Sequence, residues 1–361
     1  MSLQYASVEP ETLREFYGEN HTIDFVITFE NRMMMLNNLR LCGDIRVVDS
    51  SGNRITTANN VFIDHMLGAH SVIEGVKTTF QNKLVETYDG YARYYSMLQK
   101  STMANDDTMN GSAVCELKSP DDKITRNLLT GIDGDDVGFA IKPFFCLNNA
   151  VGDGVQLLSS KKSGVVRITF KLARNNAVLY GTDNSGHKYE LRNVRLKYVT
   201  VPEDGSNQKI VMRHKTYFDY EVSSSFVNVA SKVPALMCDG VSISFQQKSH
   251  QYDGLHNQQA LERLPGVEEV QFLFNDNQMN YVTYKLDDSR EILQRYLESF
   301  GSDYNTFRPE RIAGDMAYGV GIPFAEFVNL TNQKFNVQIQ SAANVSNPYI
   351  AYLYFHGLVE V

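Results

Sequence analysis

Residues 137–172, VGFAIKPFFCLNNAVGDGVQLLSSKKSGVVRITFKL, decide the fold that we predict for this chain. They open with an apolar run that contains Pro143, Phe144 and Phe145 and that leads into a loop rich in Gly and Asn. After the polar hinge SSKKSG, apolar and polar side chains alternate over residues 166–172. Strict alternation indicates a β-strand with one buried and one solvated face.

The second half of the chain repeats this arrangement. Residues 319–342, GVGIPFAEFVNLTNQKFNVQIQSA, again place a Pro-Phe pair before an alternating strand. The segment 267–274 likewise matches 73–80 at a constant offset of 194 residues, and helical spacing of apolar side chains follows each segment. One building unit therefore occurs twice.

Many short strands joined by Gly- and Asn-rich turns point to antiparallel sandwiches. We predict an all-β chain of two consecutive eight-stranded antiparallel jelly rolls, with short helices in the loops. The polar break PEDGSNQ separates the halves. The predicted parts are an N-terminal arm or helix (1–20), a first jelly roll (21–202), a linker (203–209) and a second jelly roll (210–361).

The composition of the chain excludes several classes of function. The 361 residues carry a formal charge of −8, and residues 1–20 contain four Glu against one Arg, so the basic arm of a nucleic-acid binder is missing. No secretory signal and no apolar run of ~18 residues are present, which favours folding in a reducing cytoplasm. Four cysteines lie far apart, and we expect buried reduced thiols in strands: Cys42, Cys115, Cys146 and Cys238.

Three further segments carry structural predictions, and the first of them has two alternatives. Residues 1–20 form an amphipathic arm or short helix that docks on another surface or packs on its own domain. Residues 101–136 are rich in Asp, Asn, Thr and Gly and predict a long exposed loop. The final segment, 348–361, is almost continuously apolar, which predicts a strand buried on both faces.

Catalytic signatures are absent from the sequence: it contains no G-x-S-x-G, Walker, H-E-x-x-H or G-x-G-x-x-G motif. His65 and His70 are five residues apart, whereas two ligands on one helix face would be four apart. Asp133, Asp135 and Asp136 suggest a calcium loop, but position twelve is Phe144 and not Glu, so a solvated acidic loop is favoured. We predict no catalytic residue, no cofactor and no metal site, and hence no enzyme.

Two groups of side chains remain as candidate contact residues. The cations near the predicted strands suit solvated faces or interfacial ion pairs better than a polyanion site: Lys161, Lys162, Arg167, Arg192, Arg195 and Lys197. The tyrosines could form a sugar-stacking platform, although core and interface packing is the commoner role: Tyr88, Tyr91, Tyr94 and Tyr95.

With these residues in hand, the chain resembles the double jelly-roll major capsid proteins of tailless icosahedral viruses with an internal membrane (the tectivirus-like and adenovirus-hexon lineage). One similar segment is HSVIEGVKTTFQNKLVETYDGYARYYSMLQ, residues 70–99, with paired strands, an Asn-containing turn and a Tyr-bearing helix. The other is the stretch 137–172, in which Lys142 departs from the apolar pattern of the family. The resemblance covers the chain from about residue 21 to the end.

The resemblance implies a structural protein. Three chains would supply six sandwiches to a pseudo-hexagonal capsomer that tiles an icosahedral shell over an internal membrane. The implied partners are further copies of the chain, vertex (penton) and minor capsid proteins, and the membrane surface through the N-terminal arm, without direct nucleic-acid contact. The implied location is the virion, with synthesis and assembly in the host cytoplasm.

Two other classes compete with this interpretation. A binding module, such as a carbohydrate-binding lectin or a viral receptor-binding spike, would use the same double jelly roll. Its secreted form would usually show a signal peptide or exposed Trp, and the sequence has neither. A cupin-type enzyme needs a cluster of His ligands on strands, but the eight histidines are scattered.

Overall fold

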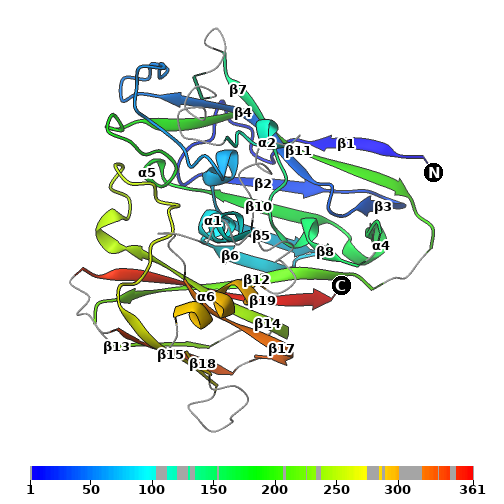
Figure 1. Ribbon diagram of the computed structural model, residues 1–361. Coiled ribbons are helices and arrows are strands. Elements are labelled where there is room, and N and C mark those ends of the chain that lie inside the picture. The colour runs from blue at the N-terminus through cyan, green and yellow to red at the C-terminus, as the bar shows by residue number, and fades with distance from the viewer. Residues whose placement is uncertain are drawn as a thin grey trace.

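The described strands form four antiparallel sheets, two in each half (Figure 1). The computed structural model describes residues 2–102, 112–119, 129–130, 135–152, 154–205, 209–224, 226–232, 237–274, 284–286, 289–300, 319–331, 333–341 and 347–360. Within these residues the sheets stack in four layers, and each half contributes two adjacent layers (Figure 1).

The first half contains sheets A and B. Sheet A is built from β7 (Val137–Ile141), β4 (Arg40–Val48), β11 (Lys188–Pro202) and β1 (Gln4–Val8), with the short β3 (Arg32–Met35) and β9 (Leu157–Ser159) extending it. Sheet B is built in order from β2 (Thr22–Ile27), β10 (Val166–Leu172), β5 (Ile73–Phe80) and β6 (Lys83–Asp89).

The second half contains sheets C and D. Sheet C runs in the order β17 (Val320–Asn329), β14 (Met237–Gln247), β19 (Tyr349–Glu360) and β12 (Val211–Val222), and it ends on β8 (Ala150–Val151) from the first half. Sheet D runs in the order β13 (Phe226–Lys232), β18 (Lys334–Ser341), β15 (Val267–Phe274) and β16 (Tyr284–Leu286).

The helices are short and lie in the connections. They are η1 (Gly68–Val72), α1 (Tyr91–Thr102), α2 (Ser112–Cys115), η3 (Cys146–Asn148), α4 (Ser160–Ser163), α5 (Asn175–Val178), η4 (Lys248–His250) and α6 (Ser289–Glu298). Among the described residues, no helix combines the length and apolarity needed to cross a membrane.

The two halves share one strand order. The order β7-β4-β11-β1 in sheet A matches β17-β14-β19-β12 in sheet C, and β2-β10-β5-β6 in sheet B matches β13-β18-β15-β16 in sheet D. The predicted 194-residue offset holds, because β5 and β15 start and end at equivalent positions. The prediction of two consecutive antiparallel jelly rolls is confirmed. The first strand of the second half, β12, is the counterpart of β1.

The alternation of apolar and polar side chains along the strands explains how each sandwich fills its core. Along β10, the side chains of Val166, Ile168 and Phe170 are fully buried, whereas Arg167 and Lys171 are exposed. Each such apolar side chain contributes about 1.5–3 kcal/mol when it leaves water. As predicted, β19 is buried on both faces, because one face joins the second core and the other joins a cluster between the jelly rolls.

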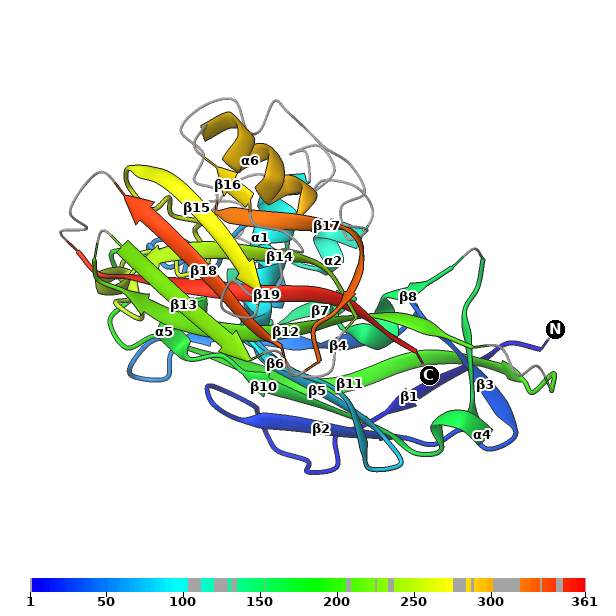
Figure 2. The same ribbon diagram turned by 90° about the horizontal axis from the view of Figure 1, so that it is seen from below.

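Of the two alternatives for residues 1–20, an arm or a short helix, the helix is wrong for the described residues 2–20. Gln4–Val8 forms strand β1, which pairs antiparallel with β11 from Gln4↔Thr200 to Val8↔Leu196. Sheet A therefore includes residues that precede position 21. The local pattern QYASV has too few apolar residues to show a strand, and the partner lies about 190 residues away in sequence. Both chain ends lie on the same side of the molecule in both views (Figures 1 and 2).

Two further predictions need correction. In the described part of 101–136, Glu116, Leu117 and Lys118 are buried while Val114 and Cys115 are exposed, and residues 103–111, 120–128 and 131–134 of the predicted loop lie outside the described residues. The four thiols are free as predicted, but Cys42 is half-buried and Cys115 is exposed at the end of α2. The linker 203–209 stays a proposal: it lies between β11 and β12, and residues 206–208 lie outside the described part.

Candidate assembly surface

The interface between the two jelly rolls of the chain is formed largely by helix α1. Helical spacing puts Tyr94, Met97 and Leu98 on one face, and these side chains pack against Tyr352 and Tyr354 of β19. Tyr296, Leu297 and Phe300, in and just after α6, complete this cluster. Because α1 follows β6 in the first jelly roll, its burial fixes the second jelly roll against the first (Figure 1).

Hydrogen bonds from α1 to the segment before β15 fix the orientation of the two jelly rolls. Arg93 Nη1 donates to the carbonyl of Ala260 at 2.5 Å, and Lys100 Nζ donates to that of Gln259 at 2.8 Å. Lys100 also pairs with the buried carboxylate of Asp64 at 2.6 Å. Burial raises the pKa of Asp64, but the ammonium of Lys100 and the hydrogen bond from Asn257 outweigh this effect and lower the pKa to about 2.

The end of β6 approaches sheet C very closely at Gly90. This residue has φ +73°, and a Cβ here would lie 2.7 Å from the ring of Tyr217 and 2.9 Å from the hydroxyl oxygen of Tyr354. Tyr354 donates its hydroxyl proton to the Gly90 carbonyl at 2.9 Å. Glycine is required for both the backbone conformation and the close packing.

The four predicted contact tyrosines are all buried. Tyr91 and Tyr95 stack on the ring of His70, whose Nδ1 lies 2.8 Å from the Tyr91 hydroxyl. Tyr94 packs between the jelly rolls, and Tyr88 donates to the Phe144 carbonyl at 2.7 Å. Their rings cannot serve as a surface for sugars. The favoured interpretation, core and interface packing, agrees with these positions.

The other candidate residues lie apart from one another. His70 is fully buried, and Asp136 pairs with Arg54, while Asp133 lies outside the described residues. In the part of the chain that the structure describes, no group of three or more His, Cys, Asp or Glu side chains could hold a metal ion. Among the cations, Arg167 pairs with Glu11, and Arg192 pairs with Glu15 and Glu190.

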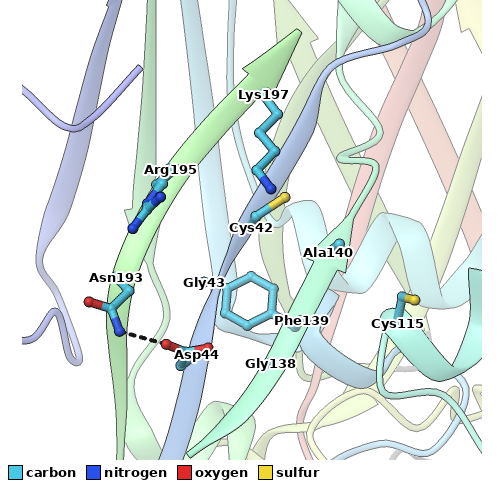
Figure 3. Close-up of a pocket in the computed structure, with 10 residues that line it drawn as sticks. All are labelled: Cys42, Gly43, Asp44, Cys115, Gly138, Phe139, Ala140, Asn193, Arg195 and Lys197. Atoms are coloured by element: carbon cyan, nitrogen blue, oxygen red, sulfur yellow. Dashed lines mark hydrogen bonds between the residues drawn. The ribbon is translucent and has the colours of Figure 1, made fainter. Parts of the chain in front are cut away.

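The outer face of sheet A carries a hollow of about 520 Å³ over β4, β7 and β11 (Figure 3). The residues that line it are Cys42, Gly43, Asp44, Cys115, Gly138, Phe139, Ala140, Asn193, Arg195 and Lys197. In Figure 3 the Lys197 ammonium points toward Cys42, and Asn193 donates to Asp44 at 2.7 Å. The sequence predicts Arg195 and Lys197 as contact residues but not this hollow, because its strands meet only in the folded sheet.

The hollow lacks the features of a nucleophilic active site. Burial raises the pKa of the Cys42 thiol, and the opposing effects of Lys197, Arg40 and Arg195 do not reverse this shift. The thiol therefore stays protonated near neutral pH, whereas a catalytic cysteine needs a lowered pKa. Arg40, Lys142, Arg195 and Lys197 are exposed around the hollow, and within the described residues none of the four forms an ion pair. The hollow is a basic surface feature.

Comparison with solved structures identifies the fold. The Faustovirus major capsid protein matches 100% of this chain and 90% of its own length, with a TM-score of 0.66 and 9% identity. The fold is that of the double jelly-roll capsid proteins. PBCV-1 VP54, fitted into a reconstruction of the virophage Sputnik, gives a TM-score of 0.60 at 9% identity over 100% of this chain and 95% of that one. The mavirus major capsid protein gives 0.51 at 9% identity over 99% and 88%.

Sequence comparison adds no relative: neither a known protein family nor a curated protein matches this chain. The similarity of this chain to the double jelly-roll capsid proteins is thus a similarity of fold, and it extends over the whole chain.

Proposed function

We propose that this chain is a viral major capsid protein, three copies of which form a pseudo-hexagonal capsomer of an icosahedral shell. The observation that carries the proposal is the match of the whole chain, without a large unmatched segment, to capsid proteins that have two jelly rolls. Two similar sandwiches per chain let a threefold assembly occupy a sixfold position. The similar structures are capsid proteins and not enzymes, in keeping with the lack of catalytic motifs.

Light scattering coupled to size exclusion tests the trimer. One chain has a mass of 40.9 kDa, so the expected species has about three times this mass, and larger closed particles would add support. A chain that remains a monomer at micromolar concentration would contradict the capsomer.

We also propose the finer parts of this function. The shell would enclose an internal membrane, would contact vertex and minor capsid proteins, and would assemble in the host cytoplasm. Because Gln4–Val8 belongs to sheet A, membrane contact of the N-terminal segment would fall to the exposed Leu13 and Phe16. Co-sedimentation with lipid vesicles that survives substitution of both residues by Ser would exclude this contact.

A binding module remains the second candidate because of a polar cavity between the jelly rolls. Its volume is about 210 Å³, and its lining includes Glu74, Asp219, Tyr217, Tyr252 and Gln251. Carboxylates and amides beside aromatic rings suit a small polyhydroxyl ligand. Binding on a glycan array by a monomeric chain, lost in Glu74→Ala, would favour this function over the capsid.

A further inference from the structure

We propose that the polar cavity between the two jelly rolls binds a small organic cation that carries ammonium groups. The cavity has a volume of about 210 Å³, and residues of β5, α1, α5, β12, β19 and the segment after η4 line it. The inference goes beyond the capsid function and does not depend on the trimer, because the whole wall belongs to one chain. Relative to a neutral polyhydroxyl ligand, the free atoms of the wall add a requirement for positive charge.

Two carboxylates of the wall lack a counter-ion. Glu74 on β5 comes from the first jelly roll and Asp219 on β12 from the second, and within the described residues neither forms an ion pair or a hydrogen bond. Glu74 is half-buried, and burial raises its pKa. A charged group that leaves water is stabilised by an opposite charge, which a cationic ligand between the jelly rolls would supply.

The cations beside the cavity have other partners. Arg93 donates to two backbone carbonyls of the segment before β15, and Lys171 pairs with Asp89 at 3.3 Å. Arg174 lies 4.9 Å from the centre of a tyrosine ring. Since Lys171 and Arg174 are also exposed, water screens their attraction for Glu74. The cavity therefore keeps two uncompensated carboxylates next to cations that are already bound elsewhere.

A buried amide oxygen of the wall also lacks a hydrogen-bond donor. Gln259 is 7% exposed, and its Nε2 donates to the carbonyl of Ala177 at 3.3 Å, which fixes the orientation of the amide. Its Oε1 then has no partner among the described residues. The corresponding oxygens of Gln246 and Gln258 both accept hydrogen bonds, at 2.8 and 2.7 Å. A buried acceptor without a donor is costly, so an N–H group of a ligand would stabilise Gln259.

The free atoms of the wall match an ammonium group. Ammonium has three N–H donors and no acceptor, whereas each sugar hydroxyl brings an acceptor with its donor. The rings of Tyr217 and Tyr252 also line the cavity, and aromatic faces attract alkylammonium groups. A metal ion fits less well, because in the described part of the chain no three His, Cys, Asp or Glu side chains could hold one.

Isothermal titration calorimetry of the full chain with putrescine tests the inference. Putrescine has two ammonium ends for the two carboxylates, and butanediol has the same length without charge. We expect one putrescine per chain at neutral pH and low ionic strength, and no heat of binding from butanediol. Glu74→Gln/Asp219→Asn should weaken the binding of putrescine at least about tenfold.

The matched control is Glu268→Gln/Glu326→Gln. It changes the net charge by the same amount at two exposed carboxylates of the second jelly roll that do not line the cavity, and Glu268 is the counterpart of Glu74 at the 194-residue offset. We expect this variant to keep the wild-type Kd. If both double variants bind putrescine equally well, the contact is not in the cavity and the inference is wrong.

A single substitution covers the case in which the cavity variant does not fold. Asp219 is exposed, so Asp219→Asn removes one of the two charges without disturbing a buried group. An unchanged Kd for putrescine in this variant would overturn the inference. Binding of butanediol as tight as that of putrescine, or a heat from calcium chloride in place of putrescine, would assign the cavity to a neutral ligand or to a metal ion and would overturn it too.

The melting temperature gives a second readout. A ligand that contacts β5 at one end and β12 at the other stabilises only the folded arrangement of the jelly rolls. We expect putrescine to raise the melting temperature of the wild type in proportion to the logarithm of its concentration, and not that of Glu74→Gln/Asp219→Asn. Light scattering on the same samples separates the two proposals, because a monomer that binds putrescine contradicts only the capsomer and a trimer that does not bind it contradicts only the cavity.

Discussion

Single buried side chains set how the stability of the first jelly roll depends on pH. Glu86 on β6 is 1% exposed, and its carboxylate accepts hydrogen bonds from the Cys146 amide at 2.9 Å and from Thr78 Oγ1 at 3.1 Å. Burial nevertheless raises the pKa of Glu86 from 4.5 to about 7. The folded protein therefore binds a proton at Glu86 over a pH range in which the unfolded chain has released it.

This raised pKa predicts a loss of stability with rising pH. The contribution is fully present below about pH 4.5 and is lost as the pH rises through 7, because the folded state then holds a buried charge. Glu86→Gln removes the titration while its amide can still serve Cys146 and Thr78. Between pH 5 and pH 8, the wild type should lose about 2 to 3 kcal/mol more unfolding free energy than the variant. Urea titrations at both pH values measure this, and parallel pH dependences would contradict the assignment.

At the scale of elements, the hairpin β5–β6 shows a turn that the sequence specifies locally. Gln81 and Asn82 form its two-residue loop with φ of +45° and +70°. Positive φ at both positions is the type I′ arrangement, which Asn and Gly adopt at low cost. We expect Asn82→Gly to leave the unfolding free energy unchanged or to raise it by up to about 1 kcal/mol.

The β-branched substitution at the same position should act in the opposite direction. Asn82→Val should lower the unfolding free energy by about 1–2 kcal/mol, because a branched Cβ is strained at positive φ. Thr87→Val, on the exposed side of β6, is the control and should change the free energy by less than about 0.5 kcal/mol. If the two Val variants have equal stability in urea, the turn does not have this conformation.

The hairpin β5–β6 is an example of the elements that can be predicted from the sequence, namely those that show a local pattern. Alternation in 73–80 and 267–274 and the tyrosine spacing of α1 are local signals, so the duplicated strands and their helices are predicted correctly. β1 gives no such signal, since Tyr5 is exposed and the strand exists through its pairing with β11. The basic hollow is likewise assembled from Cys42, Ala140 and Arg195, which three distant strands bring together. No local pattern contains that information.

At the scale of the whole molecule, the two jelly rolls share one buried cluster and so should unfold together. Met97 on α1 is fully buried against residues of the second jelly roll, although its helix belongs to the first. Met97→Ala should therefore cost about 2–5 kcal/mol and weaken the packing of both halves at once. The exposed Leu84, substituted in the same way, should cost far less.

The number of unfolding transitions shows whether the two jelly rolls unfold together or separately. We expect calorimetry and near-ultraviolet circular dichroism to give one coincident transition for the wild type and one for Met97→Ala at a lower temperature. Two separated transitions would mean that each jelly roll folds alone and that α1 couples them weakly. Under the proposed function a single transition would matter for assembly, because a chain that holds its two sandwiches at one fixed angle presents a constant geometry to neighbouring copies. Association then costs little additional ordering of the chain.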